Sequence, residues 1–364
     1  MRQGPPDARC TDLRYAAQPM TAPPSDQPPR HHRRGSYQNN HVEFTGKTLA
    51  DVLRWRWHAT RHALPPAPAA PIPRVSPDLE FLHANAKAGA RMQPSVTWIG
   101  HATAMVQLGG LTLLTDPIFS NRASPVPFAG PARHQPPGIS LHELPHIDLV
   151  LASHNHYDHL DDASVQALSR QPGGPPLFVV PLGLKAWLAA RGVHHAVELH
   201  QWQQHRLGEV DVALVPAQHW SGRGLHDRMK TLWGGFAVFA PDCHLFYAGD
   251  TGYSRDFQDI RSHFASRQSP AAGGGFDIAL LPIGAYEPRW FMAEQHVNVH
   301  EAVKIHHDLC AKRSMGVHWG TFALTDEALD EPPQVLARLR SEQGLHDDAF
   351  FVLAIGQTRL LPPR

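Results

Sequence analysis

A short run of histidine and aspartate residues is the strongest chemical signal in the chain. After the apolar residues 149–152 and Ser153 come His154, His156, Asp158 and His159. Alternate side chains at the end of a strand point to one side, so His154 and His156 can hold one metal ion while Asp158 and His159 turn toward a second. The alternative is a His-rich surface loop. It is disfavoured because charged side chains packed beside a buried strand are costly unless they are coordinated.

Three further candidate ligands stand at the ends of other apolar strands. His219 follows residues 212–215, Asp250 follows residues 245–249, and His318 follows residues 315–317. Binding sites in α/β sheets form beyond the carboxyl ends of strands, so four strands that deliver ligands there predict one converging pocket. A single histidine at a strand end is more often a hydrogen-bonded structural residue, so the prediction depends on the whole set.

The elements that must position these side chains are short strands, which come first in runs and then alternate with helices. The pattern of β-branched and aliphatic residues predicts strands at 95–100, 104–108, 111–114, 149–153, 177–180, 210–215, 235–239, 245–248, 278–283, 314–317 and 350–353. Helix-like periodicity predicts helices at 48–64, 161–169, 184–191, 300–311 and 332–343. This order of elements indicates an α/β domain.

The composition is that of a folded, neutral protein. The 364 residues include 33 Lys and Arg, 33 Asp and Glu, and 42% hydrophobic residues, which excludes a wholly disordered chain. Because there is no basic excess, a nucleic-acid partner is not predicted. The widely spaced Cys10, Cys243 and Cys310 favour a reducing, cytoplasmic location. Neither a membrane-spanning helix nor a signal peptide is expected, because no apolar run is long enough for either.

The first 90 residues differ from the rest. Residues 1–45 are rich in Pro and polar side chains and predict a disordered basic arm. Residues 46–90 predict a short amphipathic helix followed by an extended arm, because closely spaced prolines after the helix forbid regular structure. Residues 91–364 are predicted to form the main domain.

The predicted helix at 48–64 has an apolar stripe that includes Leu49, Val52, Leu53 and Trp57. It also carries a second tryptophan and several arginines. Two interpretations stay open for it. The helix lies at a membrane interface, with aromatic rings at headgroup depth and arginines near anionic lipid, or it packs on the body of the protein or on a second subunit.

These motifs resemble a known family. The pattern His154-x-His156-x-Asp158-His159, with the three later ligands in order, is similar to the signature of the metallo-β-lactamase superfamily. Residues from about 95 to 360 further resemble N-acylphosphatidylethanolamine-hydrolysing phospholipase D and its bacterial relatives. The blocks that carry this likeness are residues 98–103, 114–119, 153–160, 181–184, 248–253, 282–292 and 318–324. The resemblance implies an αββα sandwich of two mixed β-sheets with helices outside, and a homodimer.

The resemblance also implies two Zn²⁺ ions per chain. One would be held by His154, His156 and His219, the other by Asp158, His159 and His318, with Asp250 bridging them. Asp158, Asp250 and His318 are, by the same likeness, the expected catalytic residues. Iron or manganese in place of zinc is the alternative. Two zinc ions about 3.5 to 4 Å apart lower the pKa of a bridging water toward about 7.

The implied reaction is attack of that hydroxide on the phosphorus of N-acylphosphatidylethanolamine, which releases N-acylethanolamine and phosphatidic acid. A phospholipid is therefore the expected partner, with peripheral membrane contact. Two rivals stay open. One is a hydrolase of another ester, such as a lactone or a cyclic phosphate, on the same metals. The other is a metal-binding scaffold without turnover, which the presence of all seven candidate ligands disfavours.

Further residues have expected supporting roles. By the same resemblance Tyr286, Arg289, Gln295 and His296 are expected to contact the substrate, with Arg289 meeting a phosphate. The alternative is a loop packed by its own aromatic residues, in which Arg289 pairs with Glu287. Two more residues are expected to orient ligands through hydrogen bonds, with a purely structural role as the alternative for each. They are Asp116 and His101.

Overall fold

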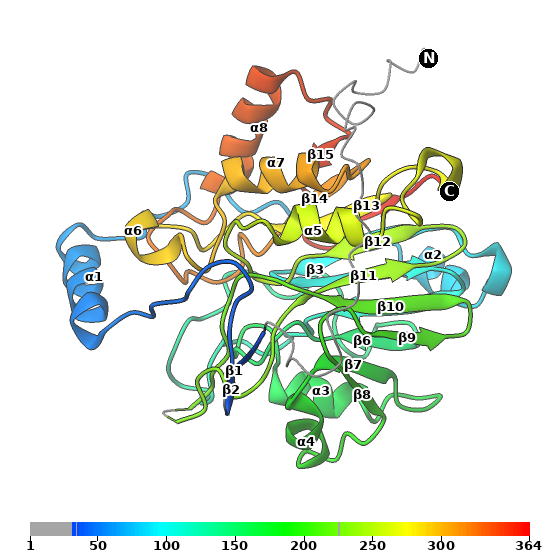
Figure 1. Cartoon of the computed structure of the whole chain (residues 1–364), viewed down its shortest axis with the longest axis horizontal. Coiled ribbons are helices and arrows are strands. Elements are labelled where there is room, and N and C mark those ends of the chain that lie inside the picture. The colour runs from blue at the N-terminus through cyan, green and yellow to red at the C-terminus, as the bar shows by residue number, and fades with distance from the viewer. Residues whose placement is uncertain (1–30, 34, 225) are drawn as a thin grey trace.

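Two seven-stranded sheets lie face to face at the centre of the molecule, with helices on both outer sides (Figure 1). The predicted αββα sandwich is therefore confirmed. This architecture is that of the computed structural model, which describes residues 31–33, 35–224 and 226–364.

The first sheet is built from the N-terminal half and one late strand. In spatial order its strands are β16 (Thr358–Leu360), β3 (Ser95–Gly100), β4 (Thr103–Leu108), β5 (Leu111–Thr115), β6 (Leu149–Leu151), β7 (Leu177–Pro181) and β8 (Ala196–Leu199). The strands from β16 to β5 pair antiparallel, and those from β5 to β8 pair parallel. Strands β3, β5, β6, β7 and β8 consequently point the same way, and their carboxyl ends share one edge.

The second sheet repeats this arrangement. Its strands are β15 (Phe350–Phe351), β14 (Ser314–Val317), β13 (Ile278–Pro282), β12 (His244–Tyr247), β11 (Gly235–Phe239), β10 (Val210–Val215) and β9 (Gln204–Leu207). Pairing is antiparallel from β9 to β12 and parallel from β12 to β15. Strands β10, β12 and β14 therefore also end at one edge, which is the edge that carries the predicted ligands.

The central strands are apolar on both faces because both faces are covered. In β6, Leu149 and Leu151 belong to the core between the sheets, while Val150 belongs to the core beneath the outer helices. In β7, Val179 and Phe178 divide in the same way. Alternate side chains of one strand thus pack into two separate cores. This explains why the sequences of these strands are continuous apolar runs.

Helices cover each sheet from outside (Figure 1). On the first sheet lie α2 (Leu79–Ala86), α3 (Asp162–Leu168) and α4 (Leu184–Ala189), and on the second lie α5 (Asp256–His263), α7 (Val299–Asp308) and α8 (Glu331–Gln343). The remaining helices are α1 (Leu49–Arg61), α6 (Arg289–Met292) and the 3₁₀ turns Gly89–Arg91 and Pro270–Ala272. Among the described helices, none combines the length and the apolar character needed to cross a membrane.

The structure differs from the sequence-based expectation at the N-terminal segment. Residues 1–30 lie outside the described residues, but the described part of 31–45, which was expected to be disordered, contacts the body. Strands β1 (His32–Arg33) and β2 (Ser36–Tyr37) form a hairpin, and the Tyr37 N–H donates to the Met229 carbonyl at 2.8 Å. Asn40 donates to Gln201 and Asp256. Hydrogen bonds to the body thus order a segment that has little apolar material to bury.

The arm at 65–90 is also only partly extended. Helix α2 begins after its last proline, where Asp78 caps the N–H of Phe81 at 2.9 Å and Leu82 is completely buried. In α1, Thr48 and Asp51 form a capping box. Three residues of the predicted apolar stripe of α1 are exposed, namely Leu49, Leu53 and Trp57. The inner side of the helix is instead made by Trp55 and Ala59.

Candidate metal centre

The seven candidate ligands come together at the shared edge of the two sheets. The run 154–159 follows β6, and the other three residues follow β10, β12 and β14. The four strands end in buried residues at this edge, so the side chains that follow them point into the same space between the two sheets' ends. The ligands that the sequence predicted from separate strands therefore occupy one cluster.

The first group contains three imidazoles. His154 Nε2 lies 2.8 Å from His156 Nδ1, and His219 Nε2 lies 3.3 Å from the same atom. Nitrogens that bind one tetrahedral Zn²⁺ at about 2.0 to 2.1 Å stand roughly 3.3 Å apart. These three nitrogen atoms are thus spaced as ligands of one ion.

The second group combines a carboxylate with two imidazoles. Asp158 Oδ2 lies 3.3 Å from His159 Nε2 and 3.3 Å from His318 Nε2, and these two nitrogens are 3.1 Å apart. His101 Nε2 also lies 3.0 Å from Asp158 Oδ2. The spacing again matches one small cation.

Asp250 lies between the two groups. Its Oδ2 is 2.9 Å from His159 Nε2 and 3.9 Å from both His154 Nε2 and His219 Nε2. Its Oδ1 is 3.2 Å from His318 Nε2, yet is buried without a hydrogen-bond partner. A carboxylate that reaches both groups and keeps an unsatisfied oxygen fits a bridge between two cations.

The backbone before Asp250 leaves no room for a side chain. Gly249 has a φ of +61°, and a Cβ there would lie 2.7 Å from the Cβ of Ser153. Glycine accepts this left-handed conformation without strain. The turn therefore brings the β12 end against the start of the His154 loop.

Asp116 contacts the second group on the side of His159 that lies away from the cluster. It accepts a hydrogen bond from His159 Nδ1 at 2.6 Å and from the backbone N–H of Ser153 at 2.6 Å, and the Tyr247 hydroxyl also donates to it. Because Nδ1 of His159 donates, Nε2 is left with its lone pair toward the cluster. Asp116 thus contacts His159 as an orienting residue would, and its orienting role stays a prediction.

His101 makes a similar link on the other side of the cluster. Besides touching Asp158, it accepts the backbone N–H of His318 through its own carbonyl at 3.0 Å. His101, Asp116 and His318 all have a positive φ, of 55°, 31° and 63°. Such conformations in residues other than glycine cost about 1 to 3 kcal/mol each, and they persist where packing holds them.

The three histidines of the first group are in the neutral form that can bind a cation. Burial, reinforced by the neighbouring imidazoles, lowers the pKa of His156 to about 3. Burial also lowers the pKa of His219 to about 4 and that of His154 well below its usual value. These rings are therefore neutral near pH 7, which is the form that binds metals.

The carboxylates and His159 shift one another's pKa values in opposite directions. Burial opposes ionisation of Asp250, but His159, His318 and His296 outweigh it and hold its pKa well below the usual range. Conversely, burial disfavours a proton on His159, but the carboxylates, Asp250 foremost, raise the pKa of His159 well above its usual value. The negative potential of the carboxylates, which retains this proton on His159, also favours a metal ion in place of the proton. The residues present therefore fit a bound cation.

The four expected substrate residues separate into two pairs. His296 is buried beside the cluster, with Nε2 at 3.8 Å from Asp250 Oδ2. Gln295 contributes its backbone, because its carbonyl accepts from Nδ1 of His219 at 2.9 Å. Its side chain instead contacts Met292.

Tyr286 and Arg289 make contacts within the protein. The Tyr286 hydroxyl donates to Glu331 at 2.7 Å. Arg289 pairs with Glu301 at 2.8 Å and donates to the His296 carbonyl at 2.8 Å. Arg289 therefore fixes the loop that carries His296, and its ion-pair partner is Glu301 instead of the Glu287 considered from the sequence.

Some residues of the site had no signal in the sequence. The Asn39 side chain accepts the His219 backbone N–H at 3.0 Å. Arg223 donates to the carbonyls of Asn155 and Leu160, at 2.8 and 2.6 Å, and so holds the His154 loop from below. In the sequence Tyr247 resembles any core aromatic residue of a strand. Its place in β12, three residues before Asp250, is the one feature that could have indicated a contact with the site.

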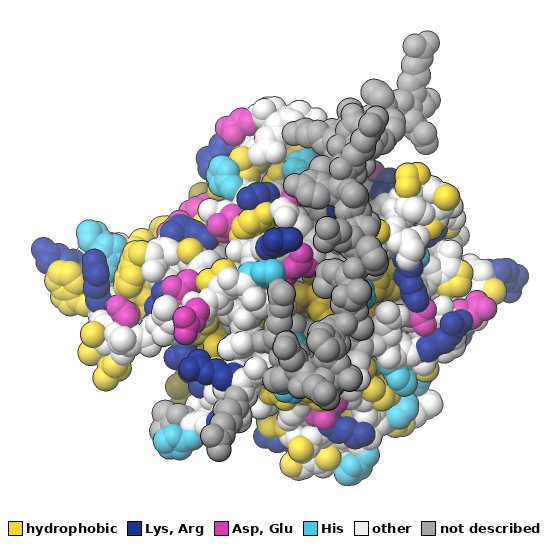
Figure 2. Space-filling view, in the orientation of Figure 1, with side chains coloured by type: hydrophobic (Ala, Val, Ile, Leu, Met, Phe, Trp, Pro, Cys, Tyr) yellow, Lys and Arg dark blue, Asp and Glu magenta, His cyan; other side chains and the backbone are white. Residues whose placement is uncertain are grey.

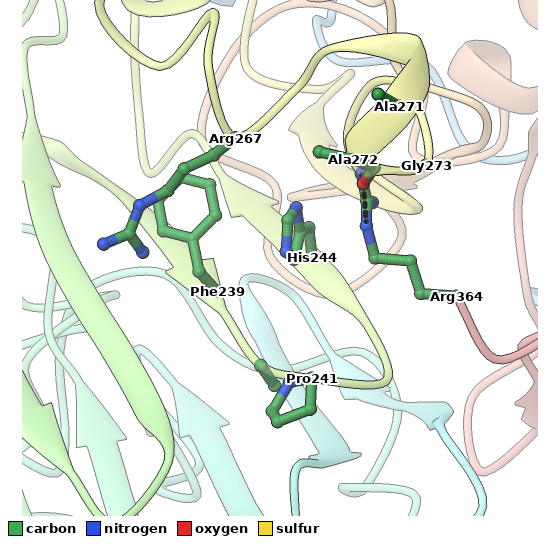
Figure 3. Close-up of a pocket in the computed structure, with 9 residues that line it drawn as sticks. Phe239, Pro241, His244, Arg267, Ala271, Ala272, Gly273 and Arg364 are labelled. Atoms are coloured by element: carbon green, nitrogen blue, oxygen red, sulfur yellow. Dashed lines mark hydrogen bonds between the residues drawn. The ribbon is translucent and has the colours of Figure 1, made fainter.

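A surface cavity of about 660 Å³ lies away from this cluster, beside the turn Pro270–Ala272. Figure 3 shows Arg267 against the ring of Phe239, with His244 and Arg364 nearby. Arg267 pairs with Asp211 at 2.9 Å and Arg364 pairs with Asp277 at 2.7 Å. Since both guanidinium groups are already neutralised, this cavity does not offer an evident anion site.

Comparisons with known proteins identify the family of the chain. Residues 112–319 match the family model described as beta-lactamase superfamily domain. N-acyl-phosphatidylethanolamine-hydrolyzing phospholipase D 1 of Caenorhabditis elegans is 38% identical over 274 residues, which cover 72% of this chain and 74% of that protein. The mitochondrial N-acyl-phosphatidylethanolamine-hydrolyzing phospholipase D of Saccharomyces cerevisiae is 34% identical over 320 residues, covering 85% of this chain and 66% of that protein.

A solved structure supports the fold alone. The isothiocyanate hydrolase from Delia radicum gut bacteria superposes with a TM-score of 0.57 at 18% identity, over 74% of this chain and 99% of that one.

From the family match and these relatives, the chain belongs to the metallo-β-lactamase superfamily, as a metal-dependent hydrolase whose similar relatives include N-acylphosphatidylethanolamine-hydrolysing phospholipases D.

Proposed function

We propose that this protein is a dinuclear zinc phosphodiesterase of the phospholipase D type, which cleaves N-acylphosphatidylethanolamine into N-acylethanolamine and phosphatidic acid. The observation that carries the proposal is the position of the Asp250 carboxylate between two groups of three donors each. The printed activities of the worm and yeast relatives support the choice of substrate.

The proposed ligands follow from the two groups. His154, His156 and His219 would hold one ion, Asp158, His159 and His318 the other, and Asp250 both. Bound there, two zinc ions would supply Lewis acidity and a water of lowered pKa. Three neutral imidazoles on one side and carboxylates on both sides are a donor set suited to zinc.

The chain's own residues prepare the ligands and the substrate position. The Gln295 carbonyl can only accept, so Nδ1 of His219 carries the proton and Nε2 faces the centre. Asp116 imposes the same tautomer on His159. His296 belongs to neither proposed group; its Nε2 lies 3.8 Å from Asp250 Oδ2, and we expect it to donate a hydrogen bond to a phosphoryl oxygen of the substrate.

The net reaction balances without a protein nucleophile. The oxygen of water bonds to phosphorus as the bond from phosphorus to the N-acylethanolamine oxygen breaks, and the leaving oxygen takes a proton. The described chain contributes ligands, tautomer control and a hydrogen-bond donor. Cys243, which is completely buried in the core, needs no part in the chemistry.

The test is a pair of assays on the zinc-loaded full-length protein. Bis-p-nitrophenyl phosphate reports phosphodiesterase turnover, and mass spectrometry of products from N-acylphosphatidylethanolamine reports the lipid reaction. We expect activity in both, with a loss of at least about a thousandfold in Asp250→Ala, on the scale of catalytic-group removal. The control is Asp347→Ala, whose side chain is 86% exposed. Turnover of the model ester without lipid products would overturn the proposed substrate while keeping the hydrolase.

We also propose that α1 brings the protein to a lipid surface from the cytoplasm. Leu49, Leu53 and Trp57 are 75%, 60% and 62% exposed, and their spacing of four residues places them on one helix face. Figure 2 shows apolar and basic side chains together at the α1 end of the molecule. Exposed apolar residues beside arginines are typical of an interfacial helix.

The helix is connected to the metal centre through α6. The Trp55 ring packs on Phe291 with centroids 4.8 Å apart, and its indole N–H donates to Asp326 at 2.8 Å. Phe291 lies five residues before His296. A surface-bound α1 would therefore hold the centre close to its lipid substrate.

Sedimentation with vesicles of phosphatidylcholine and phosphatidylglycerol tests this contact. The triple variant Leu49→Ser, Leu53→Ser, Trp57→Ser should pellet several-fold less than the wild type. Leu360→Ser is the control, because Leu360 is a comparably exposed apolar residue, 53% exposed, on the distant strand β16. Equal pelleting would overturn the lipid contact, and a change from dimer to monomer in light scattering would assign the stripe to a homodimer interface.

A further inference from the structure

A second histidine cluster lies outside the metal centre. His31 and His32 stand at the start of the β1–β2 hairpin, and His200 directly follows β8. Their ring nitrogens lie within 4.8 Å of one another. None of the three residues belongs to the candidate ligands described above.

The distances within this cluster fit coordination better than hydrogen bonding. His32 Nε2 lies 3.4 Å from His200 Nδ1, beyond the usual range of a hydrogen bond but close to the roughly 3.3 Å between two nitrogens on a tetrahedral zinc ion. The ring centroids of His31 and His32 are 4.7 Å apart, and those of His32 and His200 are 5.3 Å apart. Three imidazoles thus surround one small space.

His31 supplies an independent sign of a missing partner. The residue is only 3% exposed, and its Nε2 has no hydrogen-bond partner. Leaving a buried polar atom unsatisfied costs about 1 to 3 kcal/mol. A cation at the centre of the cluster would satisfy this nitrogen together with those of His32 and His200.

We propose that His31, His32 and His200 form a separate zinc site, with water completing the coordination. Imidazole nitrogens suit zinc, copper and nickel, and zinc is the ion for which three histidines and one water are a common set. The site goes beyond the proposed hydrolase function, because it shares no ligand with the metal centre. Strand β8 is two strands away from β6, which at the usual strand spacing is about 10 Å.

The consequence of this site is structural. The ion would fasten the hairpin to the end of β8, and seven residues after His32 the Asn39 side chain accepts the His219 backbone N–H. The Trp233 indole also donates to Asn39, at 3.1 Å. The segment that the ion holds is therefore the one that supports a ligand of the metal centre.

The first experiment counts bound zinc. The full chain is stripped with a chelator, reloaded with Zn²⁺, passed through gel filtration and analysed by mass spectrometry for zinc per chain. The variant His200→Gln should bind one ion fewer than the wild type. The control His194→Gln changes a nearby exposed histidine outside the cluster and should bind as many as the wild type. Equal counts in all three proteins would overturn the proposal.

A second experiment needs no variant and so does not depend on how a substitution folds. Diethyl pyrocarbonate modifies accessible imidazoles, and peptide mass spectrometry locates the product. Saturating Zn²⁺ should reduce the modification of His32 and His200 at least about fivefold while leaving His194 unchanged. Unchanged reactivity of His32 and His200 would overturn the site. Because neither experiment measures hydrolysis, the site can fail while the proposed function stands, and the reverse also holds.

Discussion

Oδ2 of Asp116 lies 2.6 Å from Nδ1 of His159, on the side of the ring opposite to Nε2, which faces the metal centre. The same carboxylate accepts from the Ser153 N–H and from the Tyr247 hydroxyl. Asp116 therefore joins the end of β5, the His154 loop and β12 through one side chain. We therefore propose that Asp116 positions His159, because it contacts the proposed ligand through Nδ1.

Substituting Asp116→Asn tests this role. The variant keeps the size of the side chain but removes the charge, so Nδ1 of His159 loses its strong acceptor. We expect zinc affinity at the centre to fall about 10- to 100-fold, measured by competition with a chelating dye. Asp347→Asn, at an exposed carboxylate, should leave the affinity unchanged. Equal affinities in the two variants would contradict the positioning role.

Gly249→Ala tests the close approach before Asp250. The new Cβ meets Ser153, and the residue must keep a φ of +61°. Gly208→Ala is a matched control, since Gly208 has a φ of +59° with nothing within 4 Å of its Cβ position. The control should lose about 1 to 2 kcal/mol for the left-handed backbone, and Gly249→Ala about 1 to 3 kcal/mol more. Urea unfolding of the metal-free proteins measures both, and a similar loss in the two would disprove the clash.

Trp55→Phe tests how α1 is attached. The variant keeps an aromatic ring against Phe291 but loses the hydrogen bond to the Asp326 carboxylate. A hydrogen bond to a charged group contributes about 1.5 to 3 kcal/mol, so amide exchange in α1 should accelerate at least about tenfold. Trp57→Phe, on the exposed side of the helix, should leave the exchange nearly unchanged. If both variants exchange alike, Trp55 is not the anchor.

His244 predicts a pH dependence of stability. Burial, with Arg364 as the next cause, lowers the pKa of His244 to about 4 from an ordinary value of 6.5. Between these values the unfolded chain binds a proton that the folded chain does not, so stability falls as the pH is lowered from 6.5 to 4. Because His244 is partly exposed, we expect its share to be only about 1 to 2 kcal/mol.

The variant His244→Gln should therefore lose less stability than the wild type between pH 7 and pH 4, as measured by urea unfolding at both. His194→Gln serves as the control at an exposed histidine. Parallel pH profiles for the wild type and His244→Gln would rule out this contribution.

Sequence alone determined the features that depend on neighbouring residues. Runs of β-branched and aliphatic residues such as 149–151 predicted the strands, and the position of His154, His156, Asp158 and His159 behind such a run predicted a metal-binding loop. These features are local, because strand propensity and the place of a residue after a strand depend on its sequence neighbours. The edge strands β8 and β9 were missed, since residues such as Glu198, His205 and Arg206 interrupt their apolar pattern.

Only the tertiary structure decided which distant groups meet. Asp116 and Tyr247 are 131 positions apart, and no local pattern could reveal that Arg289 pairs with Glu301 or that Gln295 acts through its carbonyl. Nor could it decide that α1 packs through Trp55 while Trp57 stays exposed. The physical reason is that donors, acceptors and rings are matched by how whole elements pack, whereas composition and periodicity describe each element by itself.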